Sequence, residues 1–556
     1  MAEAAKPRTA ARILVDQLIA QGVERAACVP GESYLSVLDA LIESDIDLIT
    51  CRAEGGAAMM AEAYGKLTGR PGICFVTRGP GATNASPGLH IAAQDSTPMI
   101  LFVGQVERGM RHREAFQELD YPATFGAIAK WVVEIDRADR IPEIIARAFR
   151  VAMQGRPGPV VIALPEDMLD DVAAVPDAPR VVAAETAPAP ADMAALAELL
   201  ASAKQPLVIA GGSRWSAEAC AGLLDFATRL DFPVATAFRR AHLFRATDDH
   251  FVGDLGIGPN PALVDYLKSS DLILLIGGRM SEIASSSYTL LDIPVPRQAL
   301  VHVHPDPLEL GRVYQPTVAI NASPAAFLDA AKAIDLAAPW AEKREALRAS
   351  YLHWSGRPGT LPGGFQYGDA MAWLRQRLPA DAIIANGAGN FAGWIHRYYR
   401  FRDFATQLAP TSGSMGYGVP AGVLAKRHYP DRIVVTIAGD GDFLMNGQEF
   451  ATAVHHGIPL MVLVIDNGIY GTIRMHQEKT FPGRVSATDL TSPDFAALAR
   501  AYGGHGETVT LTSEFAPAFE RALASGKPAI VHCHLDPQAI TPTATLDQIR
   551  AAARNP

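Results

Sequence analysis

The chain has 556 residues, of which 49% are hydrophobic and 19% are charged, so it can form buried cores and carries too little charge for a disordered protein. Its formal net charge is 49 − 59 = −10 without a long basic run, which argues against nucleic acids and membranes as partners. At roughly 100–200 residues per domain, this length predicts about three or four domains.

The N-terminal segment is typical of a soluble protein. Residues 1–12 are polar and alanine-rich, and the apolar segment that follows predicts a helix with Leu14, Leu18 and Ile19 in the core, not a signal peptide. The apolar run 458–465 is far shorter than the roughly 20 residues of a membrane-spanning helix. The five cysteines are widely spaced and form no CxxC pair, so we expect a reduced, cytoplasmic protein.

The first part of the chain, residues 10–169, alternates stretches of helical periodicity with short β-rich runs. The predicted strands are 48–52, 73–77, 99–103 and 159–164. Continuous apolar strands separated by helices are typical of a buried parallel sheet. They indicate an N-terminal domain of residues 1–175, and the Ala- and Pro-rich segment 172–192 predicts an extended linker after it.

Two more blocks repeat this alternation, separated by a connection at 337–364 that is first charged and then rich in Gly and Pro. The second block, 193–336, has predicted strands at 206–210, 272–276 and 300–304. The third block, 365–556, has predicted strands at 382–385, 433–438, 460–465 and 529–533. We therefore predict an α/β protein of three domains, each a parallel sheet flanked by helices.

Acidic and amide side chains follow two consecutive strands of the third block. Strand 433–438 leads into Gly-Asp440-Gly-Asp, and strand 460–465 leads into Asp-Asn467-Gly. Because ligands bind at the carboxyl ends of parallel strands, we expect Asp440 and Asn467 to converge. Oxygen ligands beside glycine amides suit a Mg²⁺ ion held together with phosphate oxygens, whereas Gly-Asp-Gly alone could be an ordinary turn.

Two loops of the first block also have features of a binding site. Glu54 follows a strand and opens a helix of small and apolar residues, where it could be a helix cap or a carboxyl group that hydrogen-bonds a ligand nitrogen. The loop 77–84 follows the next strand, and its glycines permit close backbone approach to a ligand.

The segment from Gly439 to Asn467, the segment Arg52-Ala-Glu54-Gly-Gly-Ala-Ala and the segment Gly79-Pro-Gly-Ala-Thr-Asn resemble the thiamin-diphosphate enzymes, above all the acetolactate (acetohydroxyacid) synthase large subunits. The resemblance covers essentially the whole chain. It implies pyrimidine-binding, central and diphosphate-binding domains in chain order, with active sites between the subunits of a homodimer or homotetramer. It also implies a carboligase that decarboxylates a 2-keto acid such as pyruvate and joins the intermediate to a second carbonyl, of a keto acid or an aldehyde.

The same resemblance assigns roles to individual residues. Glu54 would hydrogen-bond the pyrimidine ring, Gln117 would donate to the reacting oxygens, and Met415 would hold the cofactor in its bent form. The Mg²⁺ ligands would be Asp440, Asn467 and the backbone carbonyl of Ile469. Further cofactor contacts are expected at Thr77, Asn84, Ala388, Asn390, Phe391, Gly413, Gly439, Gly441, Asp442 and Gly471.

Several positions depart from the synthase pattern. Thr472 stands where the family carries a methionine, and His476 where it carries a tryptophan that selects the second substrate, so the acceptor stays open. Phe116 and Arg78 complete the expected substrate pocket. Arg78 replaces the usual serine and could pair with a substrate carboxylate or lie in solvent. Phe391 replaces a histidine that contacts the diphosphate in the family.

Two other departures concern the metal loop and the central domain. Asp466 replaces the first of two family asparagines, and the second, Asn467, is kept. Arg156 and the glycine pairs near 211 and 277 keep part of the family's FAD pattern, but other parts are absent, so the resemblance leaves FAD open as a cofactor. A regulatory subunit is neither indicated nor excluded.

Other motifs have simpler interpretations. His302 and His304 alternate on a predicted strand and could bind a metal, but without a third ligand we expect ordinary surface residues. The pair His455 and His456 is expected to be structural. Two functional alternatives stay open: a decarboxylase or C–C lyase that uses the same intermediate, and a cofactor-binding homologue without turnover.

Overall fold

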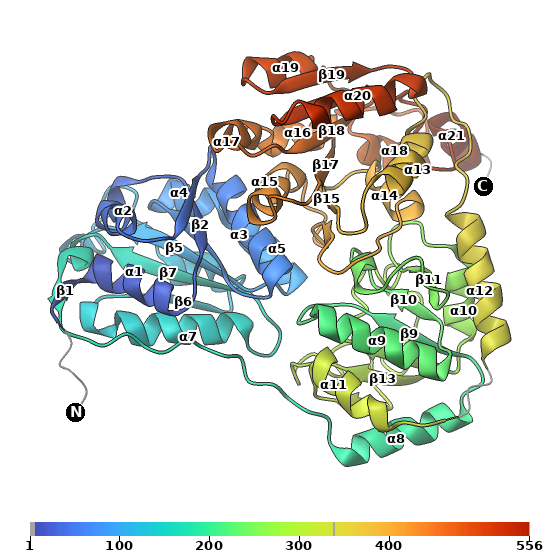
Figure 1. The fold of residues 1–556 in the computed structure, drawn as a ribbon, viewed down its shortest axis with the longest axis horizontal. Coiled ribbons are helices and arrows are strands. Elements are labelled where there is room, and N and C mark those ends of the chain that lie inside the picture. The colour runs from blue at the N-terminus through green and yellow to red at the C-terminus, as the bar shows by residue number, and fades with distance from the viewer. Residues whose placement is uncertain (1–5, 337–339, 555–556) are drawn as a thin grey trace. The chain divides into compact units, whose positions relative to one another are not determined.

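A computed structural model describes residues 6–336 and 340–554 of the chain (Figure 1). The chain forms two compact units, of which the first comprises Met1–Ala184, Val423–Ala425 and Asn446–His456, and the second comprises the other residues. The first unit contains one six-stranded parallel sheet and the second contains two. The predicted α/β class with three parallel sheets is confirmed. Within the described residues, no helix is long and apolar enough to cross a membrane.

The sheet of the first unit has the strand order β3-β2-β4-β5-β7-β6. Helices connect the strands and cover both faces, as parallel pairing requires. The strands are β2 (Arg25–Cys28), β3 (Asp47–Thr50), β4 (Gly72–Val76), β5 (Met99–Gln105), β6 (Trp131–Glu134) and β7 (Pro159–Pro165). The main helices are α1 (Ala10–Ala20), α2 (Leu35–Ile42), α3 (Glu54–Thr68), α5 (Ser86–Asp95) and α7 (Ile141–Met153).

Helix α1 buries Leu14 and Leu18 completely, as expected from their spacing. Ile19 is 44% exposed, so its expected place in the core is wrong. One residue further along a helix is a rotation of about 100°, which turns Ile19 away from the face that Leu14 and Leu18 share.

Helices α3 and α5 are joined by a buried charge cluster. Lys66 pairs with Glu62 at 3.1 Å and with Asp95, and all three side chains are buried. Thr97 donates a hydrogen bond to Glu62 at 2.8 Å. The lysine therefore supplies a positive charge to two carboxylates that have little access to water.

We expect Lys66→Met to destabilise the first unit by about 3–5 kcal/mol, because it removes a positive charge that pairs with two buried carboxylates. Urea unfolding followed by fluorescence or circular dichroism measures the change. Lys332→Met, which removes an exposed lysine paired with Asp329, is the matched control and should leave the unfolding midpoint unchanged. An equal midpoint for both variants would contradict the assigned role of Lys66.

The first sheet of the second unit has the order β11-β10-β9-β12-β13-β14. Its strands are β9 (Pro206–Ala210), β10 (Val234–Thr236), β11 (Phe251–Asp254), β12 (Leu272–Ile276), β13 (Ala299–Val303) and β14 (Val318–Ile320). Its main helices are α8 (Pro190–Ser202), α9 (Ala217–Leu230), α10 (Pro261–Ser269) and α11 (Pro324–Ala330).

His302 and His304 are buried, so the expectation of surface residues is wrong. The strand β13 is an interior strand between β12 and β14, and its end is therefore covered. His302 Nε2 lies 2.9 Å from the carbonyl oxygen of Gly278, and His304 Nδ1 lies close to the backbone of Asp306. Both imidazoles are thus held by backbone groups.

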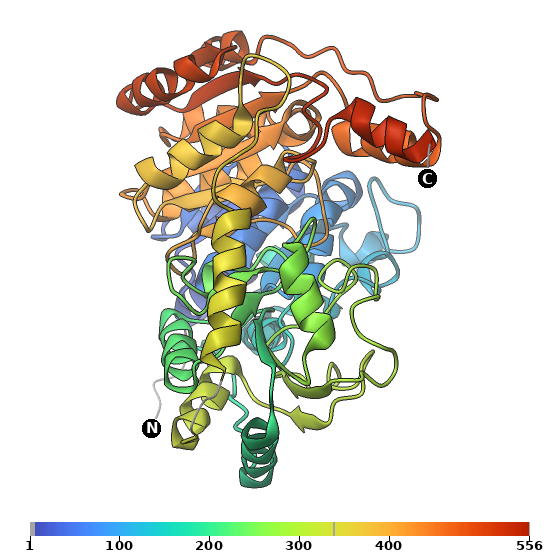
Figure 2. The same ribbon diagram turned by 90° about the vertical axis from the view of Figure 1, so that its right-hand side faces the viewer.

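The two predicted connections differ in structure. The first connection is irregular between β8 (Val172–Ala173) and the start of α8, as expected for an extended linker. The second, for which no helix was predicted, contains α12 (Ala341–Trp354), which packs against α10 and β11 (Figure 2). Residues 337–339 of this connection lie outside the described residues.

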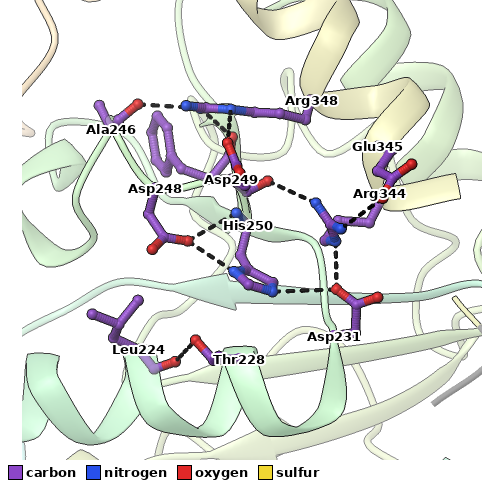
Figure 3. A network of polar contacts seen from close by, with 11 residues as sticks. Leu224, Thr228, Asp231, Ala246, Asp248, Asp249, His250, Arg344, Glu345 and Arg348 are labelled. Atoms are coloured by element: carbon purple, nitrogen blue, oxygen red, sulfur yellow. Dashed lines mark hydrogen bonds and ion pairs between the residues drawn. The ribbon is translucent and has the colours of Figure 1, made fainter. Parts of the chain in front are cut away.

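Charged side chains attach α12 to the elements around the β9–β14 sheet (Figure 3). Arg344 donates to Asp231 at 2.5 Å, and the same carboxylate lies 3.2 Å from His250. Arg348 is buried and donates to the carbonyl oxygens of Ala246 and Phe251. These contacts explain why a segment with a charged sequence forms an ordered helix.

The second sheet of this unit has the order β16-β15-β17-β18-β20-β19. Its strands are β15 (Ile383–Asn386), β16 (Gln407–Leu408), β17 (Val434–Gly439), β18 (Met461–Asp466), β19 (His505–Val509) and β20 (Ala529–His534). The neighbouring helices are α13 (Tyr367–Arg377), α14 (Ala392–Tyr398), α15 (Gly418–His428), α16 (Asp440–Asn446), α18 (Gly471–Thr480), α19 (Phe495–Ala501), α20 (Thr512–Ala524) and α21 (Leu546–Arg554). Strands β17 and β18 pair in parallel, with Gly439 opposite Ile465, so the two loops that follow them are adjacent as predicted.

Candidate functional site

The carboxyl edge of the β15–β20 sheet borders a cavity of about 250 Å³. The loops after β15, β17 and β18 line it together with the start of α18. This is the edge at which open parallel sheets bind ligands. Of the residues expected from the sequence, the cavity is lined by Ala388, Asn390, Phe391, Gly413, Met415, Gly439, Asp440, Gly441, Asp442, Asn467, Ile469, Gly471 and Thr472.

Asp440 is the first residue of α16 and is almost fully buried. Burial, together with the nearby Asp466 carboxylate, raises the pKa of Asp440 to about 7. Asn467 follows β18, and its side-chain oxygen accepts a hydrogen bond from the backbone N–H of Ile469 at 3.3 Å. A buried carboxylate with a raised pKa, beside an amide oxygen, is a donor set that a cation would stabilise.

Asp466 is held by groups outside the cavity. Its carboxylate lies 2.9 Å from His532 Nε2 on β20 and 2.9 Å from the Ser492 hydroxyl, and it accepts the backbone N–H of Gly468 at 3.0 Å. Burial would raise the pKa of Asp466, but the hydrogen bonds from His532 and Ser492 lower it to about 2. The Asp466 carboxylate therefore has its own partners in this chain.

The side chain of Asp442 joins two loops of the cavity. It is buried, and its Oδ1 accepts hydrogen bonds from the backbone N–H groups of Gly416 at 2.9 Å and Ala388 at 3.1 Å. Burial raises the pKa of Asp442 to about 7. Asp442 was expected only as a cofactor contact, and the structure adds this tethering role for its carboxylate.

Arg239 was not predicted from the sequence. It follows β10 of the β9–β14 sheet and reaches the same loops. Its guanidinium donates to the carbonyl oxygens of Gly387 at 2.9 Å and Pro410 at 2.5 Å, and it is almost fully buried. These carbonyls lie at the starts of the loops that carry Asn390 and Met415. No local signal identifies Arg239, because it is 148 positions from Gly387 in the sequence.

Glycines and two aromatic rings meet in the lining of the cavity. A Cβ atom on Gly439 would lie 3.1 Å from the Phe391 ring, and one on Gly441 would lie 2.7 Å from the Tyr470 ring. Phe391 therefore packs against the end of β17. It contributes an apolar surface to the cavity.

The substrate-pocket residues of α18 take different positions. Thr472 lines the cavity, and its hydroxyl donates to the Asn390 side chain at 2.9 Å. Asn390 in turn donates to the carbonyl oxygen of Ile540 at 3.0 Å, so its amide is occupied on both sides. His476 lies one turn further along α18, is exposed and does not line the cavity.

Glu54 is the first residue of α3 in the first unit, as predicted. Asn84 donates a hydrogen bond to its carboxylate at 3.2 Å. Residues Gly79–Asn84 form a short helix, α4, so the prediction of a loop at 77–84 is wrong over most of its length. Proline near the start of this segment favours that first helical turn. The Thr77 hydroxyl lies 2.9 Å from the Ser33 hydroxyl.

Gln117 and Phe116 lie near the start of α4. The backbone carbonyl of Gln117 accepts a hydrogen bond from Gly79 at 3.0 Å, which brings the 115–118 segment beside residues 77–79. Phe116 is 71% exposed. Arg78 does not lie in solvent: it is 9% exposed and pairs with Glu32 at 3.2 Å and Glu166 at 3.4 Å.

Comparison with known proteins gives consistent matches along the chain. The models of thiamine pyrophosphate enzyme domains match at residues 8–124 (N-terminal TPP binding domain), 193–331 (central domain) and 387–533 (C-terminal TPP binding domain). The last range contains every residue named above from the β15, β17 and β18 loops.

Curated relatives agree with these matches. The chain is 31% identical to the acetolactate synthase isozyme 2 large subunit of Escherichia coli (strain K12) over 530 residues, which covers 95% of each chain. It is 34% identical to the acetolactate synthase large subunit of Parasynechococcus marenigrum over 553 residues, which covers 96% of this chain and 88% of the relative. The chain therefore belongs to the thiamine pyrophosphate enzyme family, with acetolactate synthase large subunits among its relatives.

Proposed function

We propose that the protein is a thiamin-diphosphate- and Mg²⁺-dependent carboligase that decarboxylates a 2-keto acid such as pyruvate and joins the product to a second carbonyl. The observation that carries this proposal is the convergence of Asp440 and Asn467 from paired parallel strands on one cavity. The chain also matches both TPP binding domains of the family. Acetolactate synthase names of relatives at 30–34% identity support the reaction class.

The cavity residues fit both groups. Asp440, the side chain of Asn467 and the carbonyl of Ile469 would hold Mg²⁺, which prefers oxygen ligands and phosphate. The backbone at Gly441 and Asp442, with the loop that contains Asn390, would hold the diphosphate. When bound, thiamin diphosphate supplies a thiazolium carbon that adds to a carbonyl and accepts the electron pair released with CO₂.

Residues of this chain would then control the proton and the substrate. Glu54 would hold a proton at the pyrimidine ring, with its carboxylate oriented by Asn84. Met415 would press against the cofactor, and Gln117 would donate to the reacting oxygens, with Phe116 as a wall. We propose that Glu54 serves the cavity of a second copy, so the active unit is a homodimer or homotetramer.

Mg²⁺ binding should release a proton near neutral pH. Because the pKa of Asp440 is raised to about 7, the metal-free folded protein holds a proton there that the unfolded chain has lost. Metal-free stability should therefore fall as pH rises from about 4 to 7, and Mg²⁺ should reverse this loss. We expect the Mg²⁺ affinity to fall about tenfold per pH unit below pH 7. Calorimetry in buffers of different ionisation enthalpy counts the proton, and a pH-independent affinity between pH 5.5 and 7 would contradict the prediction.

The acceptor is the least determined part of the reaction. Thr472 lines the cavity, whereas His476 lies one turn further along the same helix. We expect His476→Trp to shift the products toward keto-acid acceptors when keto acids and aldehydes are supplied together. The larger apolar side chain would exclude other orientations of the acceptor. The product ratio measured by chromatography tests this, with exposed Lys479→Met on the same helix as control. An unchanged ratio would show that His476 does not face the acceptor.

A decarboxylase that uses the same intermediate is the second candidate, favoured by the departures at Thr472 and His476. The two reactions differ in stoichiometry. Ligation of two keto acids releases one CO₂ for every two molecules consumed, whereas simple decarboxylation releases one for each. Measuring both quantities with a panel of 2-keto acids therefore separates them, and one CO₂ for each molecule consumed, with an aldehyde as product, would replace the carboligase proposal.

FAD is not included in the proposed cofactor set. The strand order reverses between β9 and β12, where a nucleotide would bind, and the loops after these strands touch: a Cβ on Gly212 would lie 1.7 Å from the carbonyl oxygen of Gly277. Trp215 donates to the Gly211 carbonyl and Arg240 to the Gly212 carbonyl, each at 2.8 Å. Flavin absorption in the purified protein would contradict this part of the proposal.

A further inference from the structure

Glu449 is a buried carboxylate beside the N-terminus of α3. It is the first residue of α17 (Glu449–His455), which belongs to the first unit, and it is 0% exposed. Its Oε1 accepts the backbone N–H groups of Ala53 at 2.9 Å and Arg52 at 3.1 Å. Its Oε2 accepts the Thr452 hydroxyl at 2.6 Å. Three donors therefore fix the carboxylate directly in front of Glu54.

Helix α3 has no side-chain cap of its own at its N-terminus. Ala53 precedes the helix, and no side chain from this position accepts a hydrogen bond from the first turn. The helix dipole also stabilises a carboxylate at this end. Gly56 allows the close approach, because a Cβ atom there would lie 2.5 Å from Oε1 of Glu449 and 2.7 Å from its Cδ. The sequence of α3 thus leaves space for a carboxylate from another helix.

We propose that Glu449 is a positioning residue for Glu54: it fixes the two backbone amides before Glu54 and so holds the Glu54 carboxylate against Asn84. Glu449 does not line the described cavity, so it would act through Glu54 rather than on a bound ligand. The expected effect of Glu449 on the cofactor rests on the proposed function. The cap itself rests only on the contacts described above.

The main test measures exchange of the C2 proton of bound thiamin diphosphate in D₂O, read by NMR after an acid quench. The full-length variants are Glu449→Ala, Glu449→Gln, Glu54→Gln and the Glu449→Ala/Glu54→Gln double variant, each loaded with cofactor and Mg²⁺. We expect Glu449→Ala to slow exchange about 10–100-fold, since displacement of a reacting group by about 1 Å has effects of this size. Glu449→Gln should recover most of the rate, because its amide oxygen still accepts from Ala53.

The double variant separates positioning from general damage. If Glu449 acts through Glu54, Glu449→Ala should change the exchange rate little once Glu54 is already glutamine. Calorimetric binding of cofactor with Mg²⁺ should be retained, because Asp440 and Asn467 are unchanged. His455→Ala, an exposed position on the same helix, is the control and should exchange at the wild-type rate.

A second measurement does not depend on the cofactor. Amide hydrogen exchange of peptides that cover residues 50–60 of the metal-free protein should accelerate in Glu449→Ala, while peptides of the β15–β20 sheet keep their protection. Unchanged protection of residues 50–60, unchanged C2 exchange in a folded variant that binds cofactor, or multiplied effects in the double variant would each overturn the inference. If the wild-type protein binds no cofactor, the proposed function fails, and amide exchange still tests the cap.

Discussion

Asp440→Ala is expected to abolish Mg²⁺-dependent binding of thiamin diphosphate. The substitution removes the charged ligand at the carboxyl end of β17 and leaves only the neutral oxygens of Asn467 and Ile469. Loss of one partner of a buried charged pair costs about 2–5 kcal/mol, so the affinity should fall by at least about 30-fold when calorimetry is performed at saturating Mg²⁺. The fold should persist, because the substitution also relieves the repulsion between Asp440 and Asp466.

The matched control is Asp431→Ala. Asp431 is exposed and lies before the start of β17, at the end opposite Asp440. Its substitution therefore removes the same acidic group type without affecting the cavity. Cofactor affinity should then equal that of the wild-type protein. Equal, Mg²⁺-dependent binding by Asp440→Ala and the wild-type protein would refute the assignment of the metal ligand.

Glu54→Gln should leave the fold and cofactor binding intact and slow the reaction by about 10²–10⁴-fold, the usual contribution of a positioned acid or base. The amide still accepts a hydrogen bond from Asn84, but it cannot hold a shared proton at the pyrimidine ring. Steady-state turnover and the exchange rate of the C2 proton measure the two consequences separately. Both should fall together, because the proton step precedes every later bond change.

Glu107→Gln provides the comparison for this variant, since Glu107 is an exposed carboxylate of the same unit. It should retain wild-type turnover and exchange. Exchange at the wild-type rate in Glu54→Gln would remove Glu54 from the proton step, even if turnover were low for another reason.

The strands that apolar runs predicted lie inside their sheets, except for segment 48–52, which corresponds to the edge strand β3. The expected segments 206–210 and 272–276 coincide with β9 and β12, which lie next to each other at the centre of their sheet. The missed strands are short or lie toward the edges, such as β6, whose four residues are only partly buried. An edge strand has a mixed surface, so its sequence lacks the continuous apolar run that identifies a buried strand.

In the candidate site, one feature followed from the strand pattern and the other assignments came from the family resemblance. The convergence of Asp440 and Asn467 follows from two strand ends and the rule for parallel sheets, and the structure confirms that these strands are neighbours. The roles assigned to Glu54, Gln117 and Met415 come from the family resemblance and stay predictions. The domain boundaries, the cytoplasmic location and the oligomeric state also stay predictions.

Residues that act from a distance could not be found in the sequence. Arg239 and Glu449 each hold backbone groups of segments more than a hundred positions away, at Gly387 and at Arg52. Such contacts depend on tertiary packing, and no local pattern around either residue differs from an ordinary charged position. His532 is similar, because it has a function only once β20 is paired with β18 and faces Asp466.

The central claim is that this chain uses thiamin diphosphate and Mg²⁺ together to release CO₂ from a 2-keto acid. The most direct measurement is CO₂ release from carboxyl-labelled pyruvate and related 2-keto acids by cofactor-free protein, with each of the two cofactors added alone and then both together. We expect release only when both are present, and a ligated product in the same reaction. Release that is unchanged when either is omitted, or no release from any 2-keto acid by a protein that binds both, would contradict the account.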